Sequence, residues 1–153
     1  MMKKHILWMA IWALLLPAVA LAAPPKGRAA QPSAKKGKLV FVAMTGLEDI
    51  GTLSSSFRHA KAAVESGHLE HVVWLSWGRA VVSLDPTVKA VPNEVRQHAE
   101  AARAAGVELV ACAQALKKFD IDPAKLEPKA RVVENGVTEL ARLVAEGYAI
   151  IRY

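Results

Sequence analysis

Cys112 is the only cysteine in a chain of 153 residues. It follows an apolar run at residues 107–111 and precedes residues 113–119, whose spacing predicts a short helix. A strand that ends where a helix begins would place the thiol at the edge of a sheet, beside free N–H groups that stabilise a thiolate. Cys112 could therefore be a nucleophile. The alternative is a small buried side chain that has no chemical role.

The lack of a second cysteine narrows the chemistry of this thiol. It cannot form a disulfide within the chain, and the Cys-x-x-Cys pair of a dithiol oxidoreductase is missing. A persulfide carrier needs an accessible thiolate and no nearby cysteine that would resolve the persulfide as a disulfide. Three possibilities therefore stay open for the Cys112 thiol: it carries sulfur, it forms mixed disulfides with other molecules, or it does not react. Lys117 and Lys118 add positive potential if they fold back toward the thiol, or they form a solvated helix face.

Four other residues could contribute to a binding site beside the thiol. Trp77 and Arg79 follow a predicted strand, and Gly46 lies in the loop after another one. Ligands of parallel α/β sheets bind where the carboxyl ends of strands meet, so both loops would reach the same rim as Cys112. Arg79 could hold an anionic group there or be an ordinary surface arginine. Gln114 could present its amide near the sulfur.

Metal and nucleotide sites are not expected. The histidines His59, His68 and His71 are spread over a predicted helix, a turn and a strand, without a supporting pattern of cysteines or carboxylates. The loop at residues 45–49 has neither the G-x-G-x-x-G pattern nor a Walker pattern. We therefore expect no metal and no bound cofactor.

The apolar pattern predicts strands that alternate with helices. Short β-branched runs predict strands at residues 38–45, 71–76, 107–111, 130–133 and 148–153. Helical spacing predicts helices at residues 54–66, 93–105, 113–119 and 136–146. Asn135 is the expected N-cap of the last helix, and residues 77–84 form a loop or a short extra strand. This alternation predicts an α/β domain with a mostly parallel five-stranded sheet and helices on both faces. The strand order stays open.

The N-terminal part of the chain has the composition of an export signal followed by a linker. Residues 1–22 contain two lysines, an apolar stretch and the small residues that precede a cleavage site. Residues 23–37 are rich in Pro, Gly, Ala and Lys and cannot pack a core. We expect a cleaved signal, a flexible basic linker, a single domain at residues 38–153, and a periplasmic or otherwise exported protein that contacts the membrane only through the signal before cleavage.

The basic character of the chain comes from its N-terminal part. The formal net charge is +6, but seven of the 20 Lys and Arg residues lie before residue 39, which leaves 13 against 14 Asp and Glu. A nucleic-acid-binding domain carries its positive charge on the folded part. We therefore expect no nucleic-acid partner.

Two segments of the C-terminal half resemble a known family. The segments GVELVACAQAL and RVVENGVTELARLVAEGYAIIRY, with a Leu-x-Pro at residues 126–128 between them, are similar to the DsrE/DsrF-like proteins, which include the TusD-type sulfur relay subunits. The resemblance covers residues 38–153 in element order. It implies a compact single-domain three-layer α/β/α sandwich that assembles into small homo-oligomers. By this resemblance, Cys112 matches the cysteine of exported, uncharacterised members, which carry a similar strand-Cys-helix segment. In the sulfur-trafficking members of the family, a cysteine accepts a sulfane sulfur as a persulfide and passes it on.

Two functional hypotheses follow. The first is an exported protein of sulfur trafficking or thiol redox, in which Cys112 carries a persulfide between a donor and an acceptor protein. The second is a non-catalytic module that binds a small ligand or drives oligomeric assembly, with Cys112 merely buried. A thiol that gains a sulfur atom would distinguish the first from the second.

Overall fold

The computed structural model describes residues 36–153. The predicted signal at residues 1–22, and the linker up to residue 35, lie outside the described residues. None of the helices within residues 36–153 is long and apolar enough to cross a membrane.

Five parallel strands form one sheet in the order β4-β3-β2-β1-β5. The strands are β1 (Gly37–Ala43), β2 (Leu69–Ser76), β3 (Glu108–Cys112), β4 (Arg131–Val133) and β5 (Tyr148–Arg152). The three central strands are β3, β2 and β1, and the two edge strands are β4 and β5. The predicted α/β fold with a five-stranded sheet is confirmed, and every strand pair is parallel.

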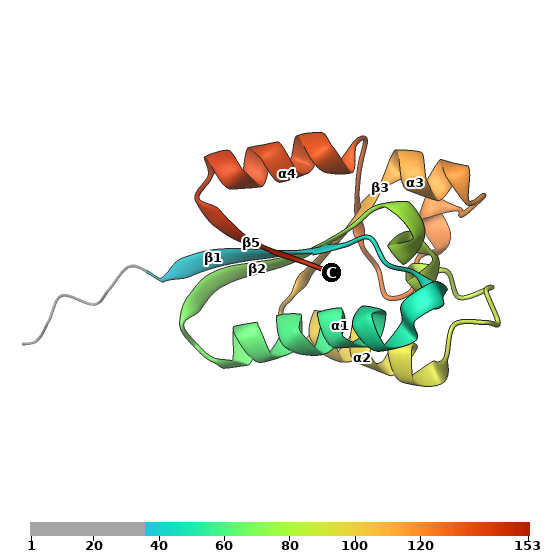
Figure 1. The fold of residues 1–153 in the computed structure, drawn as a ribbon, viewed down its shortest axis with the longest axis horizontal. Helices are drawn as coiled ribbons and strands as arrows, with labels where there is room; N and C mark the ends of the chain where they lie inside the picture. Colours follow the sequence, from blue (N-terminus) through green and yellow to red (C-terminus); the bar gives the residue numbers. More distant parts are fainter. Residues whose placement is uncertain (1–35) are drawn as a thin grey trace, which may run out of the picture. The chain divides into compact units, whose positions relative to one another are not determined.

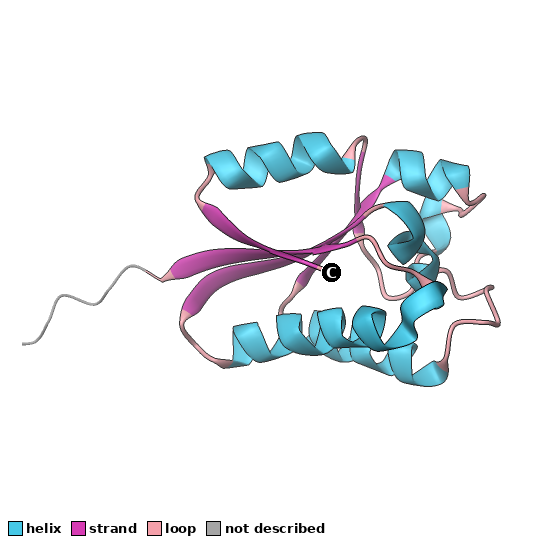
Figure 2. Ribbon diagram, in the orientation of Figure 1, coloured by secondary structure: helices cyan, strands magenta, loops and turns pink. Residues whose placement is uncertain are grey.

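Helices cover both faces of this sheet, as Figures 1 and 2 show. The helices α1 (Ile50–Glu65) and α2 (Asn93–Ala104) lie on one face, and α4 (Gly136–Ala145) lies on the other. The short helix α3 (Ala113–Lys118) directly follows β3. The result is the three-layer α/β/α arrangement that the sequence predicted.

Successive side chains of a strand point to opposite sides of the sheet. Because helices cover both sides, the central strands are buried on both faces. In β1, Phe41 packs into the larger core beneath α1 and α2, whereas Val40 and Val42 pack into the smaller core beneath α4. Trp74 of β2 is fully buried in the larger core, where its indole N–H donates to the Ser56 hydroxyl at 2.9 Å. Continuous apolar runs were therefore a reliable signal for these strands.

Local chemistry explains where elements differ from the predicted boundaries. Helix α1 begins at Ile50, four residues before the predicted start, because the Asp49 carboxylate accepts the backbone N–H of Thr52 at 2.9 Å and caps the helix. The segment expected to be a loop or strand after β2 is a 3₁₀ helix, η2 (Gly78–Leu84). Two further 3₁₀ turns, η1 (Leu47–Asp49) and η3 (Pro123–Lys125), complete the described elements.

Candidate functional site

Cys112 is both the last residue of β3 and the N-cap of α3. Cys112 is 5% exposed, and its Sγ atom accepts a hydrogen bond from the backbone N–H of Gly136 at 3.3 Å. The register of the sheet explains this contact, because Cys112 is paired with Val133 of β4 and the chain reaches α4 only three residues later. The first N–H of α4 therefore points at the sulfur, where it can stabilise negative charge.

Asn135 connects the starts of the two helices next to the thiol. Its Oδ1 atom accepts the backbone N–H groups of Val137 at 2.8 Å and Thr138 at 3.1 Å, which confirms the predicted N-cap. Its Nδ2 atom donates to Oε1 of Gln114 at 3.3 Å. One side chain thus caps α4 and holds the first turn of α3 beside it.

Gly136 lets α4 approach Trp77 closely. A Cβ atom at position 136 would lie 2.6 Å from Cε3 of the Trp77 ring and 3.3 Å from its Cβ. Real carbon atoms do not come that close, so only glycine allows this helix to start against the indole while its N–H reaches Cys112.

A pocket of about 330 Å³ opens over Cys112. It lies at the carboxyl end of β3, and its residues come from the loop after β2, from α3 and from the start of α4. The residues that line it are Trp77, Gly78, Cys112, Gln114, Ala115, Lys118, Asn135, Gly136 and Val137. Three of the five predicted site residues, Cys112, Gln114 and Trp77, are therefore together in one pocket.

The other two predicted site residues lie elsewhere. Arg79 and Gly46 do not line the Cys112 pocket. Gly78, with a φ of +57°, turns the chain after Trp77, and Arg79 then packs over Gly46, where a Cβ would be 2.6 Å from the Arg79 Cβ. The Arg79 guanidinium forms an ion pair with Glu48 at 3.4 Å. Trp77 and Arg79 both follow β2, but Trp77 lines the Cys112 pocket whereas Arg79 pairs with Glu48.

Sequence reasoning did not assign Gly136 and Val137 to the site, and it treated Asn135 only as a helix cap. The usable signal was the predicted fourth strand, because its carboxyl end reaches the same edge as the third. Residues 134–137 follow that strand just as Trp77 follows β2, so they lie at the same edge of the sheet. Their contact with Cys112 depends on the pairing of β4 with β3, and the sequence left the order of the strands open.

An ion-pair network holds α4 against the sheet. The Glu139 carboxylate is 8% exposed and accepts from Arg131 of β4 and from Arg142, each at 2.7 Å. The two hydrogen bonds from Arg142, and then the one from Arg131, lower the pKa of Glu139 to about 2. Arg131 also donates to Glu108 of β3. The network fixes the helix whose first N–H contacts the thiol.

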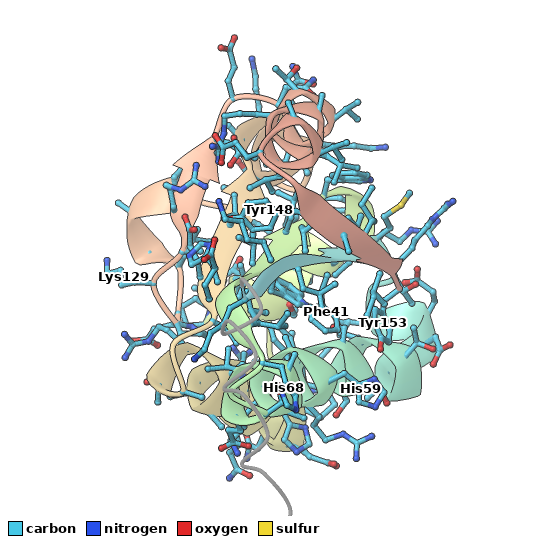
Figure 3. All side chains as sticks on the ribbon, turned by 90° about the vertical axis from the view of Figure 1, so that its left-hand side faces the viewer. Phe41, His59, His68, Lys129, Tyr148 and Tyr153 are labelled. Carbon is cyan, nitrogen blue, oxygen red and sulfur yellow. The ribbon has the colours of Figure 1, made fainter. Side chains whose placement is uncertain are left out.

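The three histidines considered as metal ligands are dispersed. His59 shares a hydrogen bond with the Tyr153 hydroxyl, and both residues are labelled in Figure 3. His71 shares one with the Tyr148 hydroxyl and lies 3.4 Å from Glu108, while His68 is exposed in a turn. Within residues 36–153, no three His, Cys, Asp or Glu side chains gather in a group that could hold a metal ion.

The family model of the DsrE/DsrF-like proteins matches residues 37–153. The chain belongs to the DsrE/DsrF-like family. The matched range coincides with the described domain from the first residue of β1 to the last residue of the chain. No curated protein matches the chain significantly.

Solved structures support the fold of this DsrE/DsrF-like domain. The ychN protein from E. coli superposes with a TM-score of 0.64 at 20% identity, over 76% of this chain and 99% of its own. MTH1491 of Methanobacterium thermoautotrophicum, a protein of unknown function, superposes with a TM-score of 0.60 at 22% identity, over 77% of this chain and all of its own. BT1422 of Bacteroides thetaiotaomicron has a TM-score of 0.60 at 19% identity, over 76% of this chain and 94% of its own. At such identities the likeness concerns the fold alone.

Proposed function

We propose that this DsrE/DsrF-like protein carries sulfane sulfur as a persulfide on Cys112. The observation that carries the proposal is the hydrogen bond from the Gly136 N–H to Sγ, at the base of a pocket of about 330 Å³. The family includes sulfur relay proteins, which supports the same chemistry. A lone cysteine suits a carrier because the chain has no second thiol that could attack the persulfide, form a disulfide with Cys112 and release the carried sulfur as sulfide.

The loading step needs no external oxidant. The Cys112 thiolate attacks the terminal sulfur of a donor persulfide, R–S–SH. A new S–S bond forms at Cys112 as the donor's own S–S bond breaks, and the electron pair of the broken bond leaves with the donor as a thiolate. Transfer to an acceptor thiol repeats the exchange in the opposite direction.

The pocket provides room for the extra sulfur and limits its exposure. The terminal sulfur of the persulfide would occupy the space next to Trp77 and Ala115, which line the pocket. Low solvent exposure of Cys112 slows attack by peroxides, which convert thiols irreversibly to sulfinic and sulfonic acids. A donor or acceptor protein would reach the sulfur only through the open side of the pocket.

Mass spectrometry of the intact protein tests this proposal. After incubation with a sulfane-sulfur donor, the wild type should gain about 32 Da, the mass of one sulfur atom, and should lose it on reduction. Cys112→Ser should gain nothing. Because the chain contains one cysteine, the site of the adduct is unambiguous. A wild type that reacts with none of several donors while fully folded would refute sulfur carriage.

A second candidate function is oligomeric assembly, and exposed apolar side chains favour it. Val137 and Val144 of α4 are 64% and 46% exposed, and Ile150 and Ile151 of the edge strand β5 are 49% and 38% exposed. A homo-oligomer would bury some of this surface. Under this alternative Cys112 is only a buried residue, and light scattering would detect the oligomer while the sulfur adduct would be absent.

We further propose that the protein is exported and that residues 1–22 are removed. The supporting feature is the order of charged, apolar and small residues at the N-terminus. Sulfur exchange would then occur outside the cytoplasm, with a donor or acceptor protein of that compartment. N-terminal sequencing of the protein recovered from cell fractions tests this; a full-length cytoplasmic product would contradict it.

A further inference from the structure

The Cys112 pocket has one charged side chain among the described residues that line it. Lys118 is that residue, and no carboxylate is among them. Gln114 and Lys118 are four residues apart and so share one face of α3, whereas Lys117 is turned away and does not line the pocket. Within residues 36–153, Lys118 forms no ion pair, and its Nζ atom lies 6.0 Å from the centre of the Phe119 ring. Lys118 is therefore a cation at the rim of this pocket that no carboxylate of the described residues neutralises.

The remaining lining groups are neutral. The amides of Gln114 and Asn135 are hydrogen-bonded to each other, Trp77 and Val137 supply apolar surface, and the Gly136 N–H points at the sulfur. Hydrogen-bond donors and a cation around a largely apolar pocket favour an anion. No carboxylate among these residues would pair with a cationic ligand.

The size of the pocket and the depth of the thiol favour a small molecule. Cys112 is 5% exposed beneath a space of about 330 Å³. A molecule of a few atoms fits within this volume together with the thiol that it must reach.

We propose that the sulfur donor of this site is a small inorganic anion with a sulfane sulfur, of which thiosulfate is the simplest example, and that Lys118 binds its anionic end. The inference rests on the proposed function, because it requires Cys112 to accept sulfur. The Cys112 thiolate attacks the outer sulfur of thiosulfate and forms a new S–S bond. The S–S bond of thiosulfate breaks, and its electron pair leaves with sulfite. Charge is conserved: a thiolate and a dianion become a perthiolate and a dianion.

Paired lysine variants and two donors test the assignment. Full-length wild type, Lys118→Gln and Lys117→Gln are incubated separately with thiosulfate and with dimethyl trisulfide, an uncharged donor that leaves a methyl disulfanyl group on a thiol. The rate at which the single thiol disappears is measured by mass spectrometry, and sulfite is measured with thiosulfate. Circular dichroism confirms that all three proteins are folded.

We expect Lys118→Gln to slow the reaction with thiosulfate by about tenfold or more, because the variant loses a charged hydrogen-bond partner of the anion. Its reaction with dimethyl trisulfide should stay within about twofold of wild type, and Lys117→Gln should match wild type with both donors, since exposed charges contribute little. Added salt should slow only the thiosulfate reaction.

The two donors separate failure of this inference from failure of the proposed function. If wild type reacts with dimethyl trisulfide but not with thiosulfate, the anionic donor is refuted while a reactive thiol stands. Equal slowing in both lysine variants would refute the specific role of Lys118. If neither donor reacts with wild type, the proposed sulfur carriage itself is refuted.

Discussion

Replacement of Gly136 by alanine is the sharpest structural perturbation of the Cys112 site. The added methyl carbon would lie 2.6 Å from Cε3 of Trp77. Carbon atoms pack at about 3.5 Å or more, so α4 or the indole must move by roughly 0.9 Å. If the helix moves, the distance from the Gly136 nitrogen to Sγ, now 3.3 Å, grows to roughly 4 Å and the hydrogen bond is lost.

Two quantities should change in Gly136→Ala. Overpacking of a buried contact costs about 1–3 kcal/mol, so the free energy of unfolding should fall by that amount. A hydrogen bond to a charged group contributes about 1.5–3 kcal/mol, so its loss from the thiolate should slow sulfur loading of Cys112 by about tenfold or more. Urea denaturation measures the first quantity, and time-resolved mass spectrometry with a sulfane-sulfur donor measures the second.

Gly51→Ala is the matched control. Gly51 lies in the first turn of α1, and a Cβ there would meet only Asp49 Oδ1 at an ordinary 3.5 Å. This variant should be as stable as wild type, or more stable by up to about 1 kcal/mol, with unchanged loading of Cys112. If Gly136→Ala behaves like Gly51→Ala in both measurements, the close contact with Trp77 does not position α4, and the reasoning about the thiol is wrong.

Two further predictions concern how α4 is held. Because the folded pKa of Glu139 is about 2, below its ordinary value of 4.5, its ion pairs stabilise the fold above pH 4.5 and are lost as the pH falls toward 2. The free energy of unfolding, measured by denaturation at several pH values, should fall between pH 4.5 and pH 2 in both proteins. The fall should be smaller in Glu139→Gln than in wild type by about 1–2 kcal/mol, a figure reduced because the arginines are exposed to solvent. Identical pH profiles would contradict the network. Asn135→Ala should lower the free energy of unfolding by about 1 kcal/mol, because it removes the two bonds that cap α4. Asn93→Ala should change that free energy by less than about 0.5 kcal/mol, because Asn93 is the first residue of α2, after the N-cap Pro92, and its side chain makes no hydrogen bond within residues 36–153. Equal losses in the two asparagine variants would exclude the cap as the cause.

The elements of this protein could be predicted from local patterns because their causes are local. A buried parallel strand is a short β-branched run, and the run before Cys112 became β3 with a boundary one residue later than expected. The Asn135 cap was visible because a side chain that accepts its own helix's N–H groups lies next to that helix in sequence. The junction of strand and helix at Cys112, and with it the choice of a candidate residue, needed no tertiary information.

The surroundings of Cys112 were decided only by the tertiary structure. The sequence predicted that strand ends share an edge, but the order β4-β3-β2-β1-β5 determines which ends are neighbours, and pairing between strands depends on contacts that no local pattern encodes. That order brings Gly136 to the sulfur across 24 residues of chain and places Trp77 against Gly136. Trp77 and Gln114 line the pocket, whereas the turn at Gly78 directs Arg79 away from it, to pack over Gly46 and pair with Glu48.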